Sequence, residues 1–276
     1  MPLLSGENRS IATGMVTSTQ GISSPAALDL QVTDERWERE KDEARAIQQS
    51  LLPEACLRGN SYEVMFRFSP YSEVGGDFAD FFGLPDGRVG IYLGDVVGKG
   101  LSAAMYAALV MGTLRGIHKS GTPAATVLTV LNKRLHVRPV HGRFCATLYA
   151  TFDPATLQLA FSNAGLPYPL LASRAGCSEL GKGGMPSGIF EPVEYDEYSY
   201  QLARGDAVLF ATDGLHELRN PKDEFLTPPQ LAEIWQTSRK KSADESLESL
   251  FAGARAFADG PRQQDHITAV VLKVLG

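Results

Sequence analysis

The stretch of sequence that decides the fold is Val89-Gly-Ile-Tyr-Leu-Gly-Asp-Val-Val-Gly-Lys-Gly-Leu-Ser-Ala-Ala104. It begins as an apolar strand that ends at Asp95, passes through the glycine-rich loop 96–100, and continues as an Ala-rich helix. A strand end holds the carboxylate rigidly, while the glycines let the adjacent backbone carbonyl turn toward the same ion. Because a carboxylate at the edge of an apolar core is costly unless a cation balances it, this stretch predicts a cation site.

Three more aspartates are set in comparable surroundings. Asp213 ends the apolar run that begins at residue 208, Asp265 precedes the last apolar strand, and Asp77 follows two glycines that allow close approach to the backbone. Asp-Gly is also a common turn dipeptide, and Asp86-Gly87 and Asp259-Gly260 are predicted to be turns only. The apolar strand that leads into the acid distinguishes a candidate ligand from a turn.

The rest of the chain predicts an α+β fold. Alternating apolar residues predict strands, most clearly at 62–68, and hairpin signals join neighbouring strands. Helices are predicted at 34–52, 101–117, 123–135, 228–237 and 243–258. Strands in runs and helices in pairs favour antiparallel sheets packed together with helices outside. We expect three segments, which are a mobile leader at 1–33, a linker or regulatory helix at 34–53, and one globular domain at 54–276.

The composition is that of an ordinary globular protein, with 276 residues that are 43% hydrophobic and carry a net charge of −6. No cluster of Lys and Arg stands out, which argues against a nucleic-acid partner, and no run approaches the roughly 20 apolar residues of a membrane span. Cys56, Cys145 and Cys177 are far apart and indicate neither a zinc site nor a disulfide framework. The N-terminus lacks the features of a signal peptide, so we expect a cytoplasmic protein.

Five segments carry a family resemblance when they are taken in order and spacing. They are Val74-Gly-Gly-Asp-Phe-Ala-Asp80, Gly94-Asp-Val-Val-Gly-Lys-Gly-Leu-Ser-Ala-Ala104, Asn163-Ala-Gly165, Ala211-Thr-Asp-Gly214 and Asp265-His-Ile-Thr268. They closely resemble the PPM-type phosphatases, also called the protein phosphatase 2C family. Within that family they are similar to the bacterial branch of the stage II sporulation phosphatase and the sigma-B stress-response phosphatases. The resemblance covers roughly residues 47–275.

The resemblance implies two stacked antiparallel β-sheets flanked by helices, with two Mn²⁺ or Mg²⁺ ions at one end. It places Asp95 between the metals, the Val96 carbonyl on the second, Asp213 and Asp265 on the first, and Asp77 at the site or just behind it. Oxygen ligands suit these ions better than zinc. The implied reaction is one-step hydrolysis of phosphoserine or phosphothreonine by a metal-bridging water. The implied substrate is a phosphorylated regulatory protein, an anti-sigma-factor antagonist.

Three residues depart from the usual pattern of this branch. His266 stands where Asp or Asn is usual, Leu166 where His is usual, and His216 where a small hydroxyl or apolar residue is common. Either histidine could protonate the leaving group, or be a core or solvated residue without a catalytic part. Lys99 could neutralise the incoming phosphate, or simply be solvated.

Two other functions compete with a phosphatase. A pseudophosphatase would keep the fold and bind a phosphoprotein without turnover, but the four retained acids argue against it. The segment Gly75-Gly-Asp-Phe78 is similar to the signature of diguanylate cyclases. The next residues, Ala79-Asp80, do not have the acid-then-Phe order of a cyclase, so this function is rejected.

The helix at 34–52 is predicted to regulate the enzyme through self-association, as a homodimer, or through docking. Trp37, Ala44 and Leu51 recur at seven-residue spacing with Ile47 between them, which gives a narrow apolar stripe suited to one partner helix. The stretch 46–53 also resembles the linker that joins upstream sensor modules to the phosphatase in this branch. Only about two and a half heptads are present, so the alternative is a helix packed on its own domain.

Overall fold

The computed structural model describes residues 25–54, 56–117, 122–259 and 263–276, and side chains from residue 36 on within those ranges. Its contacts divide the chain into two compact units, Met1–Glu40 and Lys41–Gly276. Helix α1, Pro25–Leu51, has residues in both units and begins before residue 34, where the sequence predicted its start. In the first unit Arg36 and Glu40 form an ion pair of 3.1 Å along this helix. The other part of the expected leader, 1–24, lies outside the described residues.

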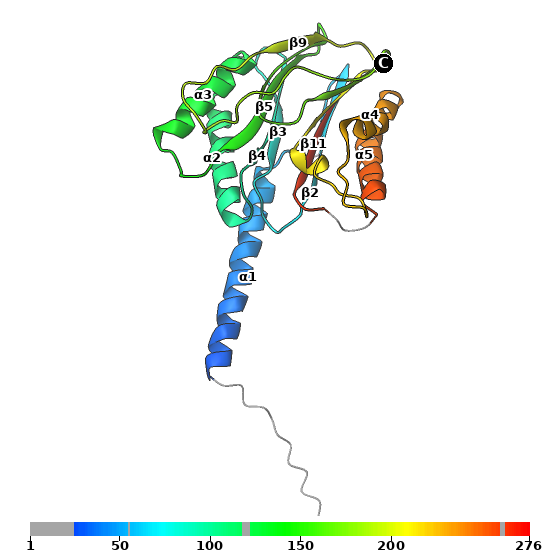
Figure 1. Cartoon of the computed structure of the whole chain (residues 1–276). Helices are drawn as coiled ribbons and strands as arrows, with labels where there is room; N and C mark the ends of the chain where they lie inside the picture. Colours follow the sequence, from blue (N-terminus) through cyan, green and yellow to red (C-terminus); the bar gives the residue numbers. More distant parts are fainter. Residues whose placement is uncertain (1–24, 55, 118–121, 260–262) are drawn as a thin grey trace, which may run out of the picture. The chain divides into compact units, whose positions relative to one another are not determined.

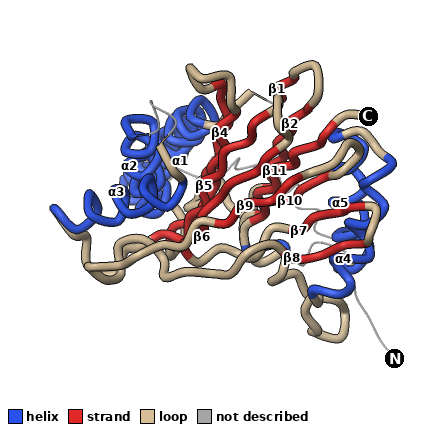
Figure 2. The backbone as a smooth tube through the Cα atoms, turned by 90° about the horizontal axis from the view of Figure 1, so that it is seen from above, coloured by secondary structure: helices blue, strands red, loops and turns tan. Residues whose placement is uncertain are grey.

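The second unit contains two antiparallel sheets (Figure 2). The six-stranded sheet has the strand order β1-β2-β11-β10-β7-β8, and the five-stranded sheet has the order β3-β4-β5-β6-β9. The first is built from β1 (Cys56–Arg58), β2 (Tyr62–Ser69), β7 (Leu170–Ser173), β8 (Gly176–Glu179), β10 (Ala207–Ala211) and β11 (Ile267–Val274). The second is built from β3 (Phe78–Gly83), β4 (Val89–Val96), β5 (Cys145–Asp153), β6 (Gln158–Ala164) and β9 (Tyr198–Gln201).

Helices cover the outer faces of both sheets (Figure 1). Helices α2 (Leu101–Ile117) and α3 (Ala124–Val137) lie on the five-stranded sheet, and α4 (Pro228–Gln236) and α5 (Ala243–Ala258) lie on the six-stranded sheet. Short 3-10 helices follow β10 and α4, namely η1 (Asp213–Leu215) and η2 (Thr237–Lys240). These layers confirm the predicted α+β sandwich. None of the helices in the described ranges has the length and apolar character needed to cross a membrane.

Three apolar clusters fill the three interfaces between these layers. The cluster between the sheets includes Ile91, Leu93 and Phe210, all buried. Strand β4 is buried on both faces because it lies between β3 and β5 in a sheet that is covered on both sides. This position explains why the strand leading to Asp95 is continuously apolar rather than alternating.

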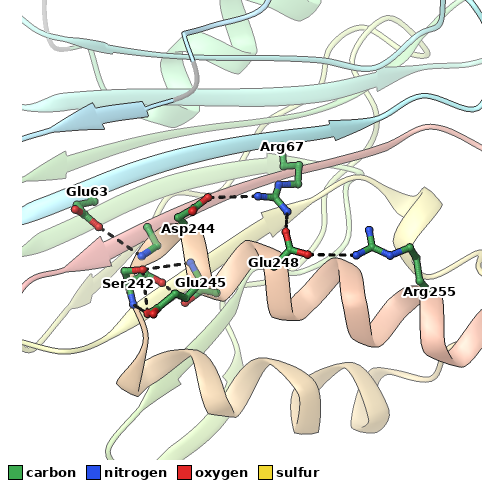
Figure 3. Close-up of polar contacts among 9 residues, drawn as sticks. Glu63, Arg67, Ser242, Asp244, Glu245, Glu248 and Arg255 are labelled. Carbon is green, nitrogen blue, oxygen red and sulfur yellow. Dashed lines mark hydrogen bonds and ion pairs between the residues drawn. The ribbon is translucent and has the colours of Figure 1, made fainter.

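Helix α5 is fastened to β2 by polar contacts at its exposed side (Figure 3). Ser242 and Glu245 form a reciprocal capping box at its start. Arg67 on β2 pairs with Glu248 at 2.5 Å and with Asp244 at 3.3 Å. Because these groups are solvated, the buried apolar face of α5 contributes more to its packing than the ion pairs do.

Candidate metal centre

The four acids that the sequence singled out lie at one end of the two sheets. Asp77 directly precedes β3, Asp95 lies near the end of β4, Asp213 begins η1 just after β10, and Asp265 lies just before β11. The start of β3 pairs with the end of β4, and the end of β10 pairs with the start of β11. Antiparallel pairing therefore brings Asp77 close to Asp95 at one end of the five-stranded sheet. It likewise brings Asp213 close to Asp265 at one end of the six-stranded sheet.

Asp77 is the most deeply buried of the four acids, since only 3% of the residue is exposed to solvent. Its Oδ2 accepts hydrogen bonds from the hydroxyl of Thr268 at 2.6 Å and from that of Thr212 at 2.9 Å. Both threonines belong to the six-stranded sheet side, so they tie an acid of one sheet to the other sheet. Burial raises the pKa of Asp77, and the two hydroxyls offset part of that increase.

Asp95 packs against the backbone of Gly76. A Cβ at Gly76 would lie 2.5 Å from the Val96 carbonyl oxygen and 2.8 Å from Asp95 Oδ1, so a larger residue could not be accommodated without displacing both oxygens. The Val96 N–H donates to the Gly76 carbonyl at 3.3 Å. Burial raises the pKa of Asp95, and the nearby charges of Asp77 and Asp213 raise it further.

The remaining two acids differ in how their charge is balanced. Burial raises the pKa of Asp213, and the carboxylates of Glu217 and Asp265 add to the increase. Asp265 has a cation beside it, because the Lys99 Nζ lies 2.7 Å from its Oδ2. The same ammonium group lies 4.7 Å from the ring centroid of Tyr71. Lys99 therefore balances part of the negative charge of the cluster.

The donor set fits divalent cations by chemistry and charge. Carboxylates and one backbone carbonyl provide oxygen donors only, and acids whose pKa values are raised by mutual repulsion are stabilised by a bound cation. Within the described ranges, no three His, Cys, Asp or Glu side chains are arranged to hold a metal ion as they stand. Three contacts already engage two of these acids, because Lys99 pairs with Asp265 and the hydroxyl groups of Thr212 and Thr268 donate to Asp77.

His266 is enclosed by the loop that precedes Asp77. Its Nδ1 accepts a hydrogen bond from the Tyr71 N–H at 3.2 Å, so Nε2 carries the proton of the neutral ring. Nε2 lies 3.2 Å from Ser72 Oγ, and its ring stacks on Phe68 at 5.5 Å. The residue is 2% exposed, and burial lowers the pKa of the ring. Because both nitrogens are engaged inside the protein, this placement favours a structural role for His266 over that of general acid.

His216 is in a different situation. It follows η1 directly, and its N–H donates to the Asp213 carbonyl at 2.7 Å. The residue is half-buried, and burial lowers the pKa of its imidazole. Within the described residues, no side chain makes a hydrogen bond or ion pair with its ring. Unlike His266, His216 therefore has a ring that the described side chains leave without a hydrogen-bond partner.

Sequence reasoning missed the residues that hold the acids in place. Thr212 and Thr268 are in the quoted motifs, and their positions beside Asp213 and near Asp265 were the available signal. Arg143 had no such signal, yet its Nη1 donates to the Val97 carbonyl at 2.5 Å and thereby fixes the loop after Asp95. These contacts join residues that are far apart in the chain.

Comparisons with known proteins identify the family and the fold of the chain. A family model described as Stage II sporulation protein E (SpoIIE) matches residues 85–275. The phosphoserine phosphatase RsbU of Bacillus subtilis is 23% identical over 232 residues, which cover 83% of this chain and 68% of RsbU. The phosphoserine phosphatase RsbP of the same organism is 26% identical over 182 residues, which cover 64% of this chain and 45% of RsbP. The chain thus spans about two thirds of one relative and under half of the other.

Solved structures have the same fold. The PP2C domain of SiaA from Pseudomonas aeruginosa has a TM-score of 0.77 at 18% identity, covering 88% of this chain and 98% of that one. The SpoIIE phosphatase domain of Bacillus subtilis, with a fragment of its regulatory domain, has a TM-score of 0.68 at 18% identity, covering 78% and 64%. Together with the family model, which matches well over half of the chain, these findings show that the chain belongs to the SpoIIE family, a bacterial branch of the PPM-type protein serine/threonine phosphatases.

Proposed function

We propose that the chain removes phosphate from phosphoserine or phosphothreonine of a regulatory protein in one step that depends on divalent ions. The observation that carries this proposal is the cluster of four acids at adjoining strand ends, three of which have pKa values raised by burial and by neighbouring carboxylates. Such a cluster is unfavourable by itself and becomes favourable when cations occupy it.

In this proposal Asp95, the Val96 carbonyl, Asp213 and Asp265 hold two Mn²⁺ or Mg²⁺ ions, with Asp77 at or just behind them. Ions bound there supply Lewis-acid chemistry that activates water and offsets charge on the phosphoryl oxygens. The other residues of the site hold the carboxylates in position and bind the substrate. Lys99, once released from Asp265, is the proposed phosphate contact.

The proposed substrate is an anti-sigma-factor antagonist in its phosphorylated form. Support comes from the family to which the chain belongs and from RsbU and RsbP, which are named phosphoserine phosphatases. A pseudophosphatase that binds such a protein without turnover is the alternative. The retained acids and the contacts that hold them support an active enzyme instead.

Hydrolysis of two substrates with different leaving groups tests both the activity and the role of His216. With Mn²⁺ the protein should release phosphate from a phosphoserine protein and from an aryl phosphate. His216→Ala should lower the first rate by about 100-fold and the second by only a few-fold, because an aryl leaving group needs little protonation. The exposed His141, changed to Ala, is the matched control. Equal losses on both substrates remove His216 as the acid, and no release from either favours the pseudophosphatase.

The second half of α1 is proposed to link regulation to the metal centre. The Gln48 side chain donates to the Gly75 carbonyl at 2.7 Å and accepts from the Gly75 N–H at 3.1 Å, two residues before Asp77. Arg115 on α2 donates to the Leu51 carbonyl at 2.7 Å. Gln48 and Leu51 therefore connect the second half of α1 with the loop before Asp77 and with α2. Displacement of this helix by a partner or a second copy would move the loop that carries Asp77.

Removal of this link should lower activity without removing any ligand. Gln48→Ala is expected to reduce turnover with Mn²⁺ by about 10-fold, the effect typical of groups that position metal ligands. Its neighbour Gln49→Ala, whose side chain is exposed, is the control. A chain that begins at Pro53 should lose activity similarly, and light scattering shows whether it also loses self-association. Unchanged mass and unchanged activity in the shortened chain would leave α1 no regulatory role.

A further inference from the structure

A groove with strong positive charge lies between the turn after β7 and the end of α4. It is an open hollow of about 840 Å³, called here the basic groove. Its lining residues are Ser173, Arg174, Glu233, Gln236, Thr237, Arg239, Lys240 and Lys241. Four of them are cations and one is an acid, although the chain as a whole carries a net charge of −6. The sequence did not reveal this cluster, because Arg174 is far in the chain from the other three.

The basic groove is separate from the acids of the metal centre. Strand β10 begins at Ala207, which pairs with Ala172 of β7 just before the groove, and it ends just before Asp213. Six residues of extended strand separate these ends, or about 20 Å. A ligand in the groove therefore lies at the opposite end of the six-stranded sheet from the proposed reaction.

Within the described ranges the cations of the groove have no acidic partner within ion-pair distance, although the charge of Lys241 interacts with the nearby carboxylate of Glu245. Within the described ranges, the side chains of Arg174, Arg239 and Lys240 make no hydrogen bond or ion pair. Lys241 donates only to hydroxyl groups, at 2.6 Å to Ser249 and 3.3 Å to Thr237. Several arginines elsewhere on the surface do have acidic partners, as Arg67 has Glu248 and Arg255 has Glu248. A local excess of unpaired positive charge in an acidic chain creates a field that attracts anions.

A buried lysine of β11, whose ammonium group donates to carbonyls of η2, adds to the positive charge near the groove. Lys273 is 5% exposed and donates to the carbonyls of Gly205 at 2.8 Å, Arg239 at 2.7 Å and Ser238 at 3.2 Å. Carbonyl oxygens solvate the ammonium group but do not cancel its charge. The same segment contains buried polar atoms that have no partner within the described protein, among them Arg239 Nε and Gln236 Oε1. A buried donor without a partner is unfavourable, so a carboxylate that reached Arg239 Nε would be stabilised there, whereas Gln236 Oε1 is an acceptor and adds nothing to the binding of a carboxylate.

We propose that the basic groove binds an acidic segment of a protein partner, through Asp and Glu side chains. The charge of the groove selects an anionic ligand. The cations come from two separate segments around a wide, open hollow, which suits a chain with several spaced carboxylates rather than one compact anion. No aromatic side chain is among the described lining residues, so nothing there offers a stacking surface for a nucleobase. This binding is additional to the proposed phosphatase reaction and does not depend on it.

Binding of a fluorescein-labelled acidic peptide to the full chain tests the proposal by fluorescence anisotropy. We expect the peptide to bind, and a neutral peptide of equal length not to bind. The double variant Arg174→Glu/Lys240→Glu should weaken the affinity by at least about tenfold, because rim charges become repulsive. The matched control is Lys133→Glu/Lys222→Glu, which changes the net charge equally at exposed positions outside the groove. Affinity should fall as salt is raised.

Four outcomes would overturn the proposal. They are absence of peptide binding, an equal loss in the control variant, displacement of the peptide by equimolar tripolyphosphate, and tighter groove-dependent binding of a single-stranded oligonucleotide. Hydrolysis of an aryl phosphate should be the same in the groove variant and the unchanged chain, which also verifies folding. If the charge-reversed variant fails to fold, Arg174→Gln/Lys240→Gln gives a smaller loss of the same sign. Because peptide binding is measured without turnover, its failure is distinguishable from failure of the phosphatase reaction.

Discussion

Asp95→Asn is expected to lower Mn²⁺-dependent turnover by more than about 100-fold, since metal ions contribute several kcal/mol to such reactions. Asp213→Asn should do the same. The amide keeps the size of the side chain but removes the negative charge that a cation requires. The assay is hydrolysis of an aryl phosphate at saturating Mn²⁺. At saturation, a small decrease in the affinity for Mn²⁺ does not by itself lower the measured turnover.

The same two variants should be more stable than the unchanged protein when no metal is bound. Burial and neighbouring carboxylates disfavour ionised Asp95 and Asp213, and a neutral amide relieves that repulsion. Thermal unfolding in a chelator measures the effect. Asp86→Asn is the matched control for turnover. Because Asp86 lies in the turn between β3 and β4, this substitution should change turnover little. Normal turnover by Asp95→Asn or Asp213→Asn would remove that residue from the site.

Removal of divalent ions should abolish activity and change how stability depends on pH. After exhaustive chelation we expect no hydrolysis, and recovery on addition of Mn²⁺, because the proposed ligands are all oxygen. Zn²⁺ at the same concentration is the control and should restore less. Activity that survives chelation would contradict the proposed mechanism.

The pH effect follows from the direction of the pKa shifts. Asp77, Asp95 and Asp213 have raised pKa values in the folded chain, so the folded state binds their protons more tightly than the unfolded state does. The metal-free protein should therefore lose stability as the pH rises from about 4, the ordinary carboxyl value, toward the raised values. Bound Mn²⁺ should remove this loss, because the cations favour the ionised acids. Melting curves at pH 5 and pH 8, with and without Mn²⁺, measure both.

The sequence predicted much of the fold because its signals are local. The apolar run before Asp95, the glycines after it and the Ala-rich helix that follows each appear in the structure as β4, a tight loop and α2. The hairpin signal at Asp86-Gly87 joins β3 and β4, and Gly87 has a φ of 84° that glycine adopts readily. Shorter strands gave weaker signals. Strand β8 has only four residues and contains a glycine, and it was not predicted.

By itself, the sequence determined the fold class, the family and the four strand-end acids, since strand periodicity, turn residues and ordered motifs are properties of neighbouring positions. Only the tertiary structure decided the environment of these acids and of the other candidates. Thr212 and Thr268 donate hydrogen bonds to Asp77, and Lys99 forms an ion pair with Asp265. His266 is buried by residues of another segment. Each of these contacts joins segments that are far apart in the sequence. So does the basic groove. Charge balance, burial and hydrogen-bond partners depend on which strands and loops pack together, and that packing is a property of the whole folded chain.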